Sequence, residues 1–160
     1  MARSRLRMPT PPRRGGRFCM RLSAELVCVD PKQVHLLWPI VAPLLRKAIA
    51  RTGLSAFREI ERDILQGHAL LWLAVSGEGS AAAIDAVAST SLQETDAGNV
   101  CVITACAGAR MSRWLPLIEQ IETYAKNEGC TCIRIFGRKG WLRALDGYRA
   151  KHIIMDKEID

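Results

Sequence analysis

The sequence predicts a single α/β domain of the α+β kind, in which a mixed β-sheet carries helices on both faces. The chain has 160 residues, which suffices for one domain with one sizeable hydrophobic core. Hydrophobic periodicity places its elements in the order β-α-α-β-β-β-α-β-α-β. Two buried strands in the second half, 99–105 and 130–136, are joined by a helical segment, so we expect them to lie parallel.

The first half begins with a strand over 22–29 and continues into a helix. Asp30 suits the N-cap position of this helix, and apolar residues then recur at intervals of three and four. Pro39 and Pro43 fall inside that pattern and remove two helical hydrogen bonds. We therefore expect a kink or a break near Trp38.

A second helix and an antiparallel meander of three strands follow. Ser55 is expected to cap the helix, and Gly67 to end it in the left-handed conformation. The segments 68–75 and 81–92 have the composition of strands and are separated by glycine-containing turns. They lead into the strand over 99–105.

The second half reads as a strand, a loop of small residues, a helix, a strand, a helix and a last strand. These elements cover 99–105, 106–112, 113–127, 130–136, 141–148 and 151–158. Ser112 is expected to cap the helix that follows the loop. A helix that starts just after a central strand directs free backbone N–H groups and a positive dipole end at that point. The loop over 106–112 is therefore the predicted ligand site.

The whole net charge of +7 belongs to the first 21 residues. They contain seven arginines and no acidic residue, which leaves 16 basic against 16 acidic residues in 22–160. The proline and glycine content predicts a disordered basic arm over 1–21, followed by one domain over 22–160. The alternative is a misassigned start, with Met20 as the true first residue. Such an arm could neutralise phosphates of a nucleic acid, but the neutral domain gives that partner little support.

Membrane and metal partners are not expected. No apolar run approaches the roughly 20 residues that a bilayer-spanning helix requires. The six cysteines contain no C-x-x-C pair, and the three histidines show no ligand spacing. Buried, reduced thiols are typical of a cytoplasmic protein.

The element order over about 24–158 resembles the GCN5-related N-acetyltransferase (GNAT) superfamily. Three local motifs support the resemblance: Glu122-x-x-Ala125-x-x-x-Gly129-Cys130, Ile133-Arg-Ile135 and Leu142-Arg-Ala-Leu-Asp-Gly-Tyr148. The last is similar to an aromatic-rich helix of the family that ends in Gly-Phe. The same region also resembles small GNAT-like proteins encoded by phages and prophages.

The resemblance implies acetyl-CoA as cofactor, with its pyrophosphate on backbone amides after the fourth strand and its pantetheine arm between splayed strands. The residues at those positions are Val102, Ile103, Thr104, Ala107, Gly108, Ala109, Arg110, Met111, Ser112 and Arg113. The loop departs from the family pattern Gln/Arg-x-x-Gly-x-Gly/Ala. Its small residues could equally serve only a tight strand-to-helix turn.

The resemblance also implies a tyrosine general acid and a glutamate general base, which this chain has in part. Arg143 falls about where the tyrosine would be, and the strand over 99–105 contains no carboxylate. The candidates are Tyr148 as acid, and Glu94, Asp96 or a water as base.

Two functions follow from the resemblance. The first is an acyl-CoA-dependent N-acyltransferase with an eroded cofactor loop and catalytic residues, acting on an amine-bearing small molecule or peptide. The second is a non-catalytic GNAT-like protein of phage origin, with a structural role in a virion or an interaction role through a partner surface. A nucleic-acid binder using the arm and Arg138-Lys139 is a third. Acyl transfer requires that two strands diverge beside Gly108, and that Met111 and Trp114 leave the slot between them open.

Overall fold

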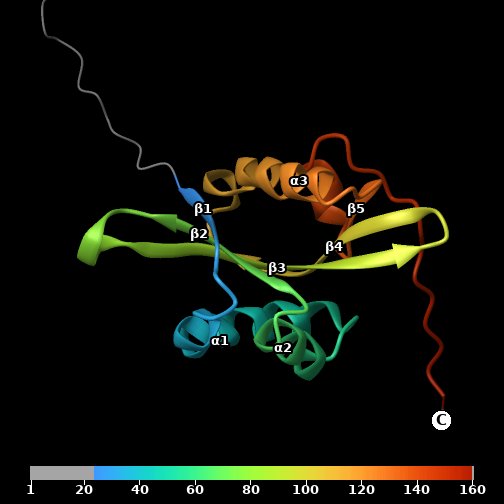
Figure 1. Ribbon diagram of the computed structural model, residues 1–160. Coiled ribbons are helices and arrows are strands. Elements are labelled where there is room, and N and C mark those ends of the chain that lie inside the picture. Colours follow the sequence, from blue (N-terminus) through green and yellow to red (C-terminus); the bar gives the residue numbers. More distant parts are fainter. Residues whose placement is uncertain (1–23, 160) are drawn as a thin grey trace, which may run out of the picture.

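The computed structural model describes residues 24–159, which form one five-stranded sheet between two helical layers (Figure 1). The strands lie side by side in chain order, and the first four are antiparallel while the fifth returns parallel to the fourth. They are β1 (Glu25–Cys28), β2 (Leu70–Ser76), β3 (Ala83–Thr95), β4 (Gly98–Gly108) and β5 (Cys132–Ile135). The predicted mixed sheet is thereby confirmed.

Helices cover both faces of the sheet. α1 (Val34–Thr52) and α2 (Phe57–Leu65) pack on one face, and α3 (Ile118–Asn127) packs on the other (Figure 1). Four 3-10 helices complete the elements: η1 (Gly79–Ala81), η2 (Met111–Arg113), η3 (Leu115–Leu117) and η4 (Lys139–Arg143). In the described part of the chain, no helix is both long and apolar enough to cross a bilayer.

The two faces of the sheet are packed unequally. The α1–α2 side is filled by large aliphatic side chains, namely Val41, Leu45, Ile49, Ile60, Ile64, Leu71, Leu73 and Val87. On the α3 side the sheet presents the small residues Ala74, Ala86 and Ala88 to tryptophans and isoleucines. The site described below lies where these two cores meet at the end of β4.

α1 differs from its prediction at both points tested. It begins at Val34 and not at Asp30, whose carboxylate instead accepts a hydrogen bond from the Lys32 N–H at 2.9 Å in the preceding turn. The break expected near Trp38 is wrong, because the helix runs through both prolines. Pro39 and Pro43 lie on the exposed side, where water can satisfy the carbonyls that lose a partner.

The helix ends were predicted better than the helix starts. Gly67 and Gly129 adopt φ values of 76° and 72° just after α2 and α3, as expected for glycine in the left-handed conformation. The predicted caps Ser55 and Ser112 are wrong, because the N-cap residues are Ala56 and Leu117.

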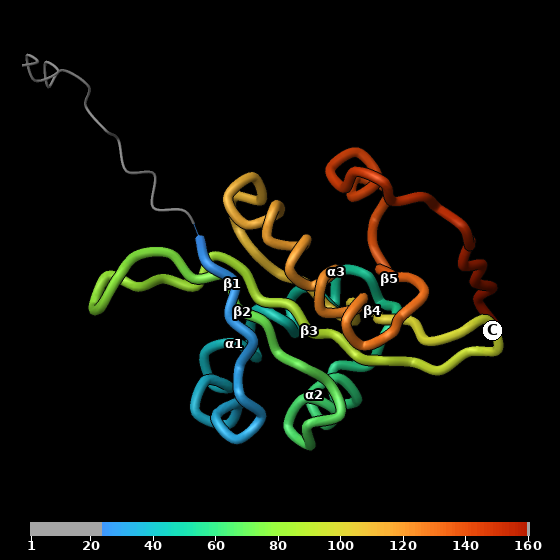
Figure 2. Tube along the Cα trace, turned by 45° about the horizontal axis from the view of Figure 1, so that its top comes forward, coloured from blue at the N-terminus to red at the C-terminus, as the bar shows by residue number. Residues whose placement is uncertain are grey.

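The C-terminal elements are corrected as well. Only the short 3-10 helix η4 forms in place of the helix expected over 141–148. The strand expected over 151–158 is irregular and exposed, since the alternating pattern of its residues meets no partner strand. Figure 2 shows this segment leaving the body of the fold at the end of the described chain. The predicted arm over 1–21 lies outside the described residues.

A β-bulge in β4 marks the position where the sheet opens. Ser89 of β3 lies opposite Ala105, and Thr90 lies opposite Ile103, so Thr104 is an extra residue on β4. Its hydroxyl lies 2.6 Å from the Ser89 hydroxyl and 3.3 Å from the Ser89 carbonyl oxygen. A bulge bends its strand and increases the local twist. The last residue of β4 that pairs with β5 is Ile103, directly before the bulge.

Gly108, at the end of β4, is required by packing. A Cβ atom there would lie 2.7 Å from the Ala86 Cβ, 2.9 Å from the Asp85 carbonyl oxygen and 2.9 Å from the Trp114 ring. Two of these neighbours belong to the adjacent strand and cannot move without disturbing the sheet.

We expect Gly108→Ala to lower the free energy of unfolding by about 1–3 kcal/mol, because the added methyl overpacks the sheet. Gly140→Ala is the matched control, since a Cβ at Gly140 meets no atom within 4 Å. Urea unfolding of both variants measures the difference. Equal stabilities would contradict the crowding at Gly108.

The hydroxyl pair at the bulge gives a second prediction. Thr104→Val should destabilise by about 1–3 kcal/mol, because it leaves the fully buried Ser89 hydroxyl without its partner. Ser89→Ala/Thr104→Val should lose less than the sum of the two single variants. Additive losses in urea unfolding would show that the two hydroxyls do not interact.

Candidate functional site

A cleft of about 400 Å³ opens where β4 and β5 separate. One wall is the C-terminal half of α1, from Leu44 to Thr52. The floor is β4 from Ile103 onward, and the opposite wall is the chain from Ile135 to Trp141. Ligand sites of proteins commonly have volumes of about 300–1,000 Å³.

The cleft exposes an open strand edge. β5 pairs with β4 only up to Ile103, whereas β3 stays paired with β4 up to Gly108. Over 104–108, the side of β4 that faces the cleft therefore has no strand partner among the described residues. Such an edge presents backbone N–H and C=O groups that can pair with an extended ligand.

Met111 and Trp114 could have filled the space between β4 and β5. Both instead line the cleft, which stays open. Trp114 is buried, and its indole N–H donates to the Ala109 carbonyl oxygen at 2.9 Å. Met111 is 40% exposed and lines the cleft. The divergence of the two strands beside Gly108 is thus present.

The loop after β4 differs from its prediction. The strand continues through Cys106 and Ala107, and α3 begins only at Ile118. Arg110 adopts φ 51° and ψ 60°, and η2 and η3 follow. The prediction of a helix directly after the strand is therefore wrong, because the turns through Trp114 and Pro116 come first. The first amide after β4, that of Ala109, donates to the Asp85 carbonyl oxygen, and the next amides lead into η2.

Asp85 is a buried acidic residue of the cleft that the sequence did not single out. Its side chain is only 3% exposed, and it lies 3.5 Å from Arg110 and 3.6 Å from Arg113. Its carbonyl oxygen accepts the Ala109 N–H at 3.1 Å. Asp85 is also the extra residue of a second bulge, between the pairs Val75–Ile84 and Ala74–Ala86. A lone carboxylate in a run of small apolar residues was the signal available.

Cations dominate the surroundings of the cleft. Lys47 and Arg51 line it from α1, and Arg138 lines it from the segment after β5. Of the described residues that line the cleft, Asp85 is the one acid. This distribution favours an anionic ligand over a cationic one.

The predicted cofactor residues lie together at the end of β4, although not all of them face the cleft. Those that line it are Ile103, Thr104, Ala107, Gly108, Ala109 and Met111. Val102 is fully buried in the part of β4 that is paired with β5. Arg110, Ser112 and Arg113 lie beside the cleft in the loop.

The predicted catalytic residues lie elsewhere. The Tyr148 hydroxyl donates to Glu122 Oε1 of α3 at 2.8 Å, and burial together with this hydrogen bond raises the pKa of Tyr148. Glu94 is exposed and pairs with Asn99 near the tip of the β3–β4 hairpin. Neither lines the cleft. Their catalytic roles stay predictions without support from the geometry.

The cleft holds a thiol that is not suited to nucleophilic attack. Burial raises the pKa of Cys106 to about 12, so this thiol stays neutral near pH 7. The thiolate is the reactive form of cysteine. The described residues contain no group of three or more His, Cys, Asp or Glu side chains placed to hold a metal ion.

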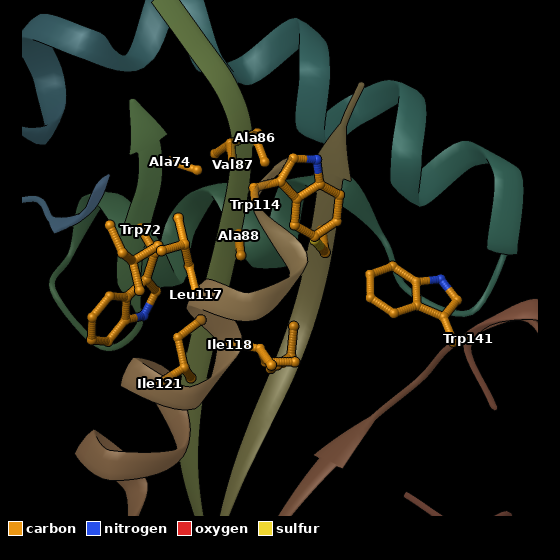
Figure 3. Close-up of a pocket in the computed structure, with 13 residues that line it drawn as sticks. Trp72, Ala74, Ala86, Val87, Ala88, Trp114, Leu117, Ile118, Ile121 and Trp141 are labelled. Carbon is orange, nitrogen blue, oxygen red and sulfur yellow. The ribbon is translucent and has the colours of Figure 1, made fainter. Parts of the chain in front are cut away.

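A second, smaller cavity of about 40 Å³ lies between the sheet and α3 (Figure 3). In Figure 3, Leu117, Ile118 and Ile121 point toward the side of the sheet that carries Ala88. Trp114 and Trp141, whose ring centroids are 6.1 Å apart, line both the cavity and the cleft. The side chains that line this cavity are apolar or aromatic.

Several solved structures with a similar fold are described as acetyltransferases. A GNAT family acetyltransferase from Staphylococcus aureus superposes with a TM-score of 0.56 at 10% identity, over 86% of this chain and 99% of that chain. A predicted acetyltransferase from Clostridium acetobutylicum, crystallised with acetyl-CoA, gives 0.57 at 15% identity, over 84% and 96%. An aminoglycoside acetyltransferase from an uncultured soil metagenomic sample gives 0.60 at 14% identity, over 86% and 99%.

No protein-family model and no curated protein matches the sequence. At the identities above, the structural likeness concerns the fold and leaves the reaction open. The chain has the fold of the GNAT-family acetyltransferases.

Proposed function

We propose that the protein binds acyl-CoA, with acetyl-CoA as the expected form, and transfers the acyl group to an amine. The observation that carries this proposal is the open edge of β4 beside a 400 Å³ cleft rimmed by cations. The fold, shared with acetyltransferases, is consistent with it.

The residues present fit such a cofactor. The pantetheine arm is extended and carries amide groups, which can pair with the free backbone groups over 104–108. The phosphates are anionic and suit Arg110 and Arg113 at the end of the strand. When bound, the cofactor supplies an activated thioester carbonyl.

Acyl transfer in this cleft relies on positioning. The amine nitrogen would attack the thioester carbon, the C–S bond would break, and the sulfur would leave as the CoA thiolate, which takes up a proton from water. Apart from Asp85, no carboxylate among the described residues lines the cleft, so the amine proton would pass to water. Holding the two reactants in the right geometry can by itself supply a large part of the rate enhancement.

A second candidate function is favoured by one observation. Tyr148 and Glu94 both lie away from the cleft, which suits a GNAT-like protein that binds a ligand or a partner without catalysis. A phage-derived structural or interaction protein belongs to this class. Turnover of acetyl-CoA with a panel of amines separates the two functions.

Binding of acetyl-CoA is the direct test. At 100 times its dissociation constant, the cofactor should stabilise the protein by about 2.7 kcal/mol, which is a shift of several degrees in thermal unfolding. The absence of a shift at millimolar acetyl-CoA would refute the proposal. Lys47→Gln/Arg138→Gln should reduce the shift and its dependence on salt, because both cations line the cleft. Lys126→Gln, on the exposed surface of α3, is the matched control.

If the amine attacks the thioester directly, no cysteine carries the acyl group, and the buried Cys106 thiol should be unreactive. At pH 8, iodoacetamide should modify the exposed Cys132 and leave Cys106 unmodified, because the pKa of Cys106 is raised to about 12. Peptide mass spectrometry after partial alkylation measures this order. An acyl group trapped on Cys106 during turnover would show a covalent mechanism instead.

A further inference from the structure

We propose that Asp85 is a positioning residue for the cofactor phosphates. It holds the guanidinium groups of Arg110 and Arg113 close together at the end of β4, so that both contact the diphosphate of one acyl-CoA molecule. This inference rests on the proposed function and adds a residue and a role to it.

The carboxylate bridges the two arginines. Arg110 Nη2 lies 3.5 Å from Asp85 Oδ1, and Arg113 Nη2 lies 3.6 Å from Asp85 Oδ2. Both arginines start from one 3-10 turn, which the hydrogen bond from the Arg113 N–H to the Arg110 carbonyl oxygen closes at 2.9 Å. Without the carboxylate, two like charges three residues apart would repel each other.

The position of Asp85 is set by the sheet. Its backbone belongs to the bulge in β3, and its carbonyl oxygen accepts the Ala109 N–H, which ties the start of the loop to the same residue. Since its side chain is only 3% exposed, it has little freedom to follow the loop. Arg110, at the start of this loop, has the left-handed backbone conformation, with φ 51°.

Stability alone does not account for the charge. Asp85 Oδ2 is buried and has no hydrogen-bond partner among the described residues. A buried carboxylate in this state is unfavourable, and an uncharged side chain of similar volume would suit the fold better. A negative charge at Asp85 is explained if this residue orients the guanidinium groups of Arg110 and Arg113.

Both arginine side chains reach the surface. They are 69% and 31% exposed, and both contacts to Asp85 are longer than the 2.7–2.9 Å of a charge-assisted hydrogen bond. A guanidinium group has five N–H donors in a rigid plane, so it can contact a carboxylate and a phosphate at the same time. The three side chains together keep a charge of +1, which suits a diphosphate.

The experiment compares two ligands by isothermal titration calorimetry. Acetyl-CoA carries the diphosphate, whereas S-acetylpantetheine carries the same thioester without it. Asp85→Asn, which keeps the shape and removes the charge, should weaken acetyl-CoA binding about tenfold and leave S-acetylpantetheine unchanged. Glu78→Gln removes an exposed acidic charge in the turn after β2 and is the matched control.

A double-mutant cycle tests whether Asp85 acts through the arginines. In an Arg110→Gln/Arg113→Gln background, Asp85→Asn should have no further effect on acetyl-CoA binding. A loss that persists there overturns the inference, as does equal weakening of both ligands, which would indicate a merely structural role. Tighter binding of acetyl-CoA by Asp85→Asn also overturns it, because Asp85 would then compete with the phosphates.

The remaining outcomes are equally decisive. If Asp85→Asn does not fold, Arg110→Lys/Arg113→Lys replaces it, because this variant keeps both charges and removes the planar donors. It should bind acetyl-CoA more weakly and S-acetylpantetheine as before. Unchanged binding of both ligands overturns the inference. If the unaltered protein binds no acetyl-CoA, the proposed function fails and the inference falls with it. Normal binding by the unaltered protein with no effect of Asp85→Asn overturns the inference alone.

Discussion

The pairing of β4 with β5 ends at Ile103, and this limit gives the site its shape. β5 ends at Ile135, opposite Ile103, and the extra residue Thr104, which contacts the Ser89 hydroxyl, follows directly on β4. A bulge of this kind bends its strand and increases the local twist. The open strand edge over 104–108 and the cleft beside it both begin at this point.

The sequence predicted most of the fold because the fold depends on patterns that extend over many residues. The apolar stripe of α1 and the alternating strands of the meander each involve several turns or pairs, so one misleading residue does not hide them. Predictions that depended on a single residue were weaker. Ser55 and Ser112 are good caps in isolation, but the turns before α2 and α3 start those helices elsewhere. The strand expected over 151–158 has a suitable pattern and finds no neighbour with which to pair.

The position of the cleft could be predicted from the sequence, whereas its chemistry could not be assigned. The end of the central strand is where the cleft lies, because the order of the elements brings it there. The contact of Asp85 with Arg110 and Arg113 joins residues from a strand bulge and a loop, and no spacing in the sequence indicates such a contact. At Gly108 the sequence offered a signal that has a structural explanation. A glycine fits a phosphate-binding loop, but the crowding by Trp114 and Ala86 is sufficient to explain why this residue is glycine.

The two prolines of α1 have a mechanical consequence for the cleft. Each lacks an N–H group, so the carbonyls of His35 and Pro39 lose their helical partners on the exposed side. A helix bends most easily where its internal ladder is incomplete. The segment beyond Pro43, from Leu44 to Thr52, is the one that forms a wall of the cleft. Bending of α1 at its prolines would therefore change the width of the opening without any change in the pairing of β3 with β4.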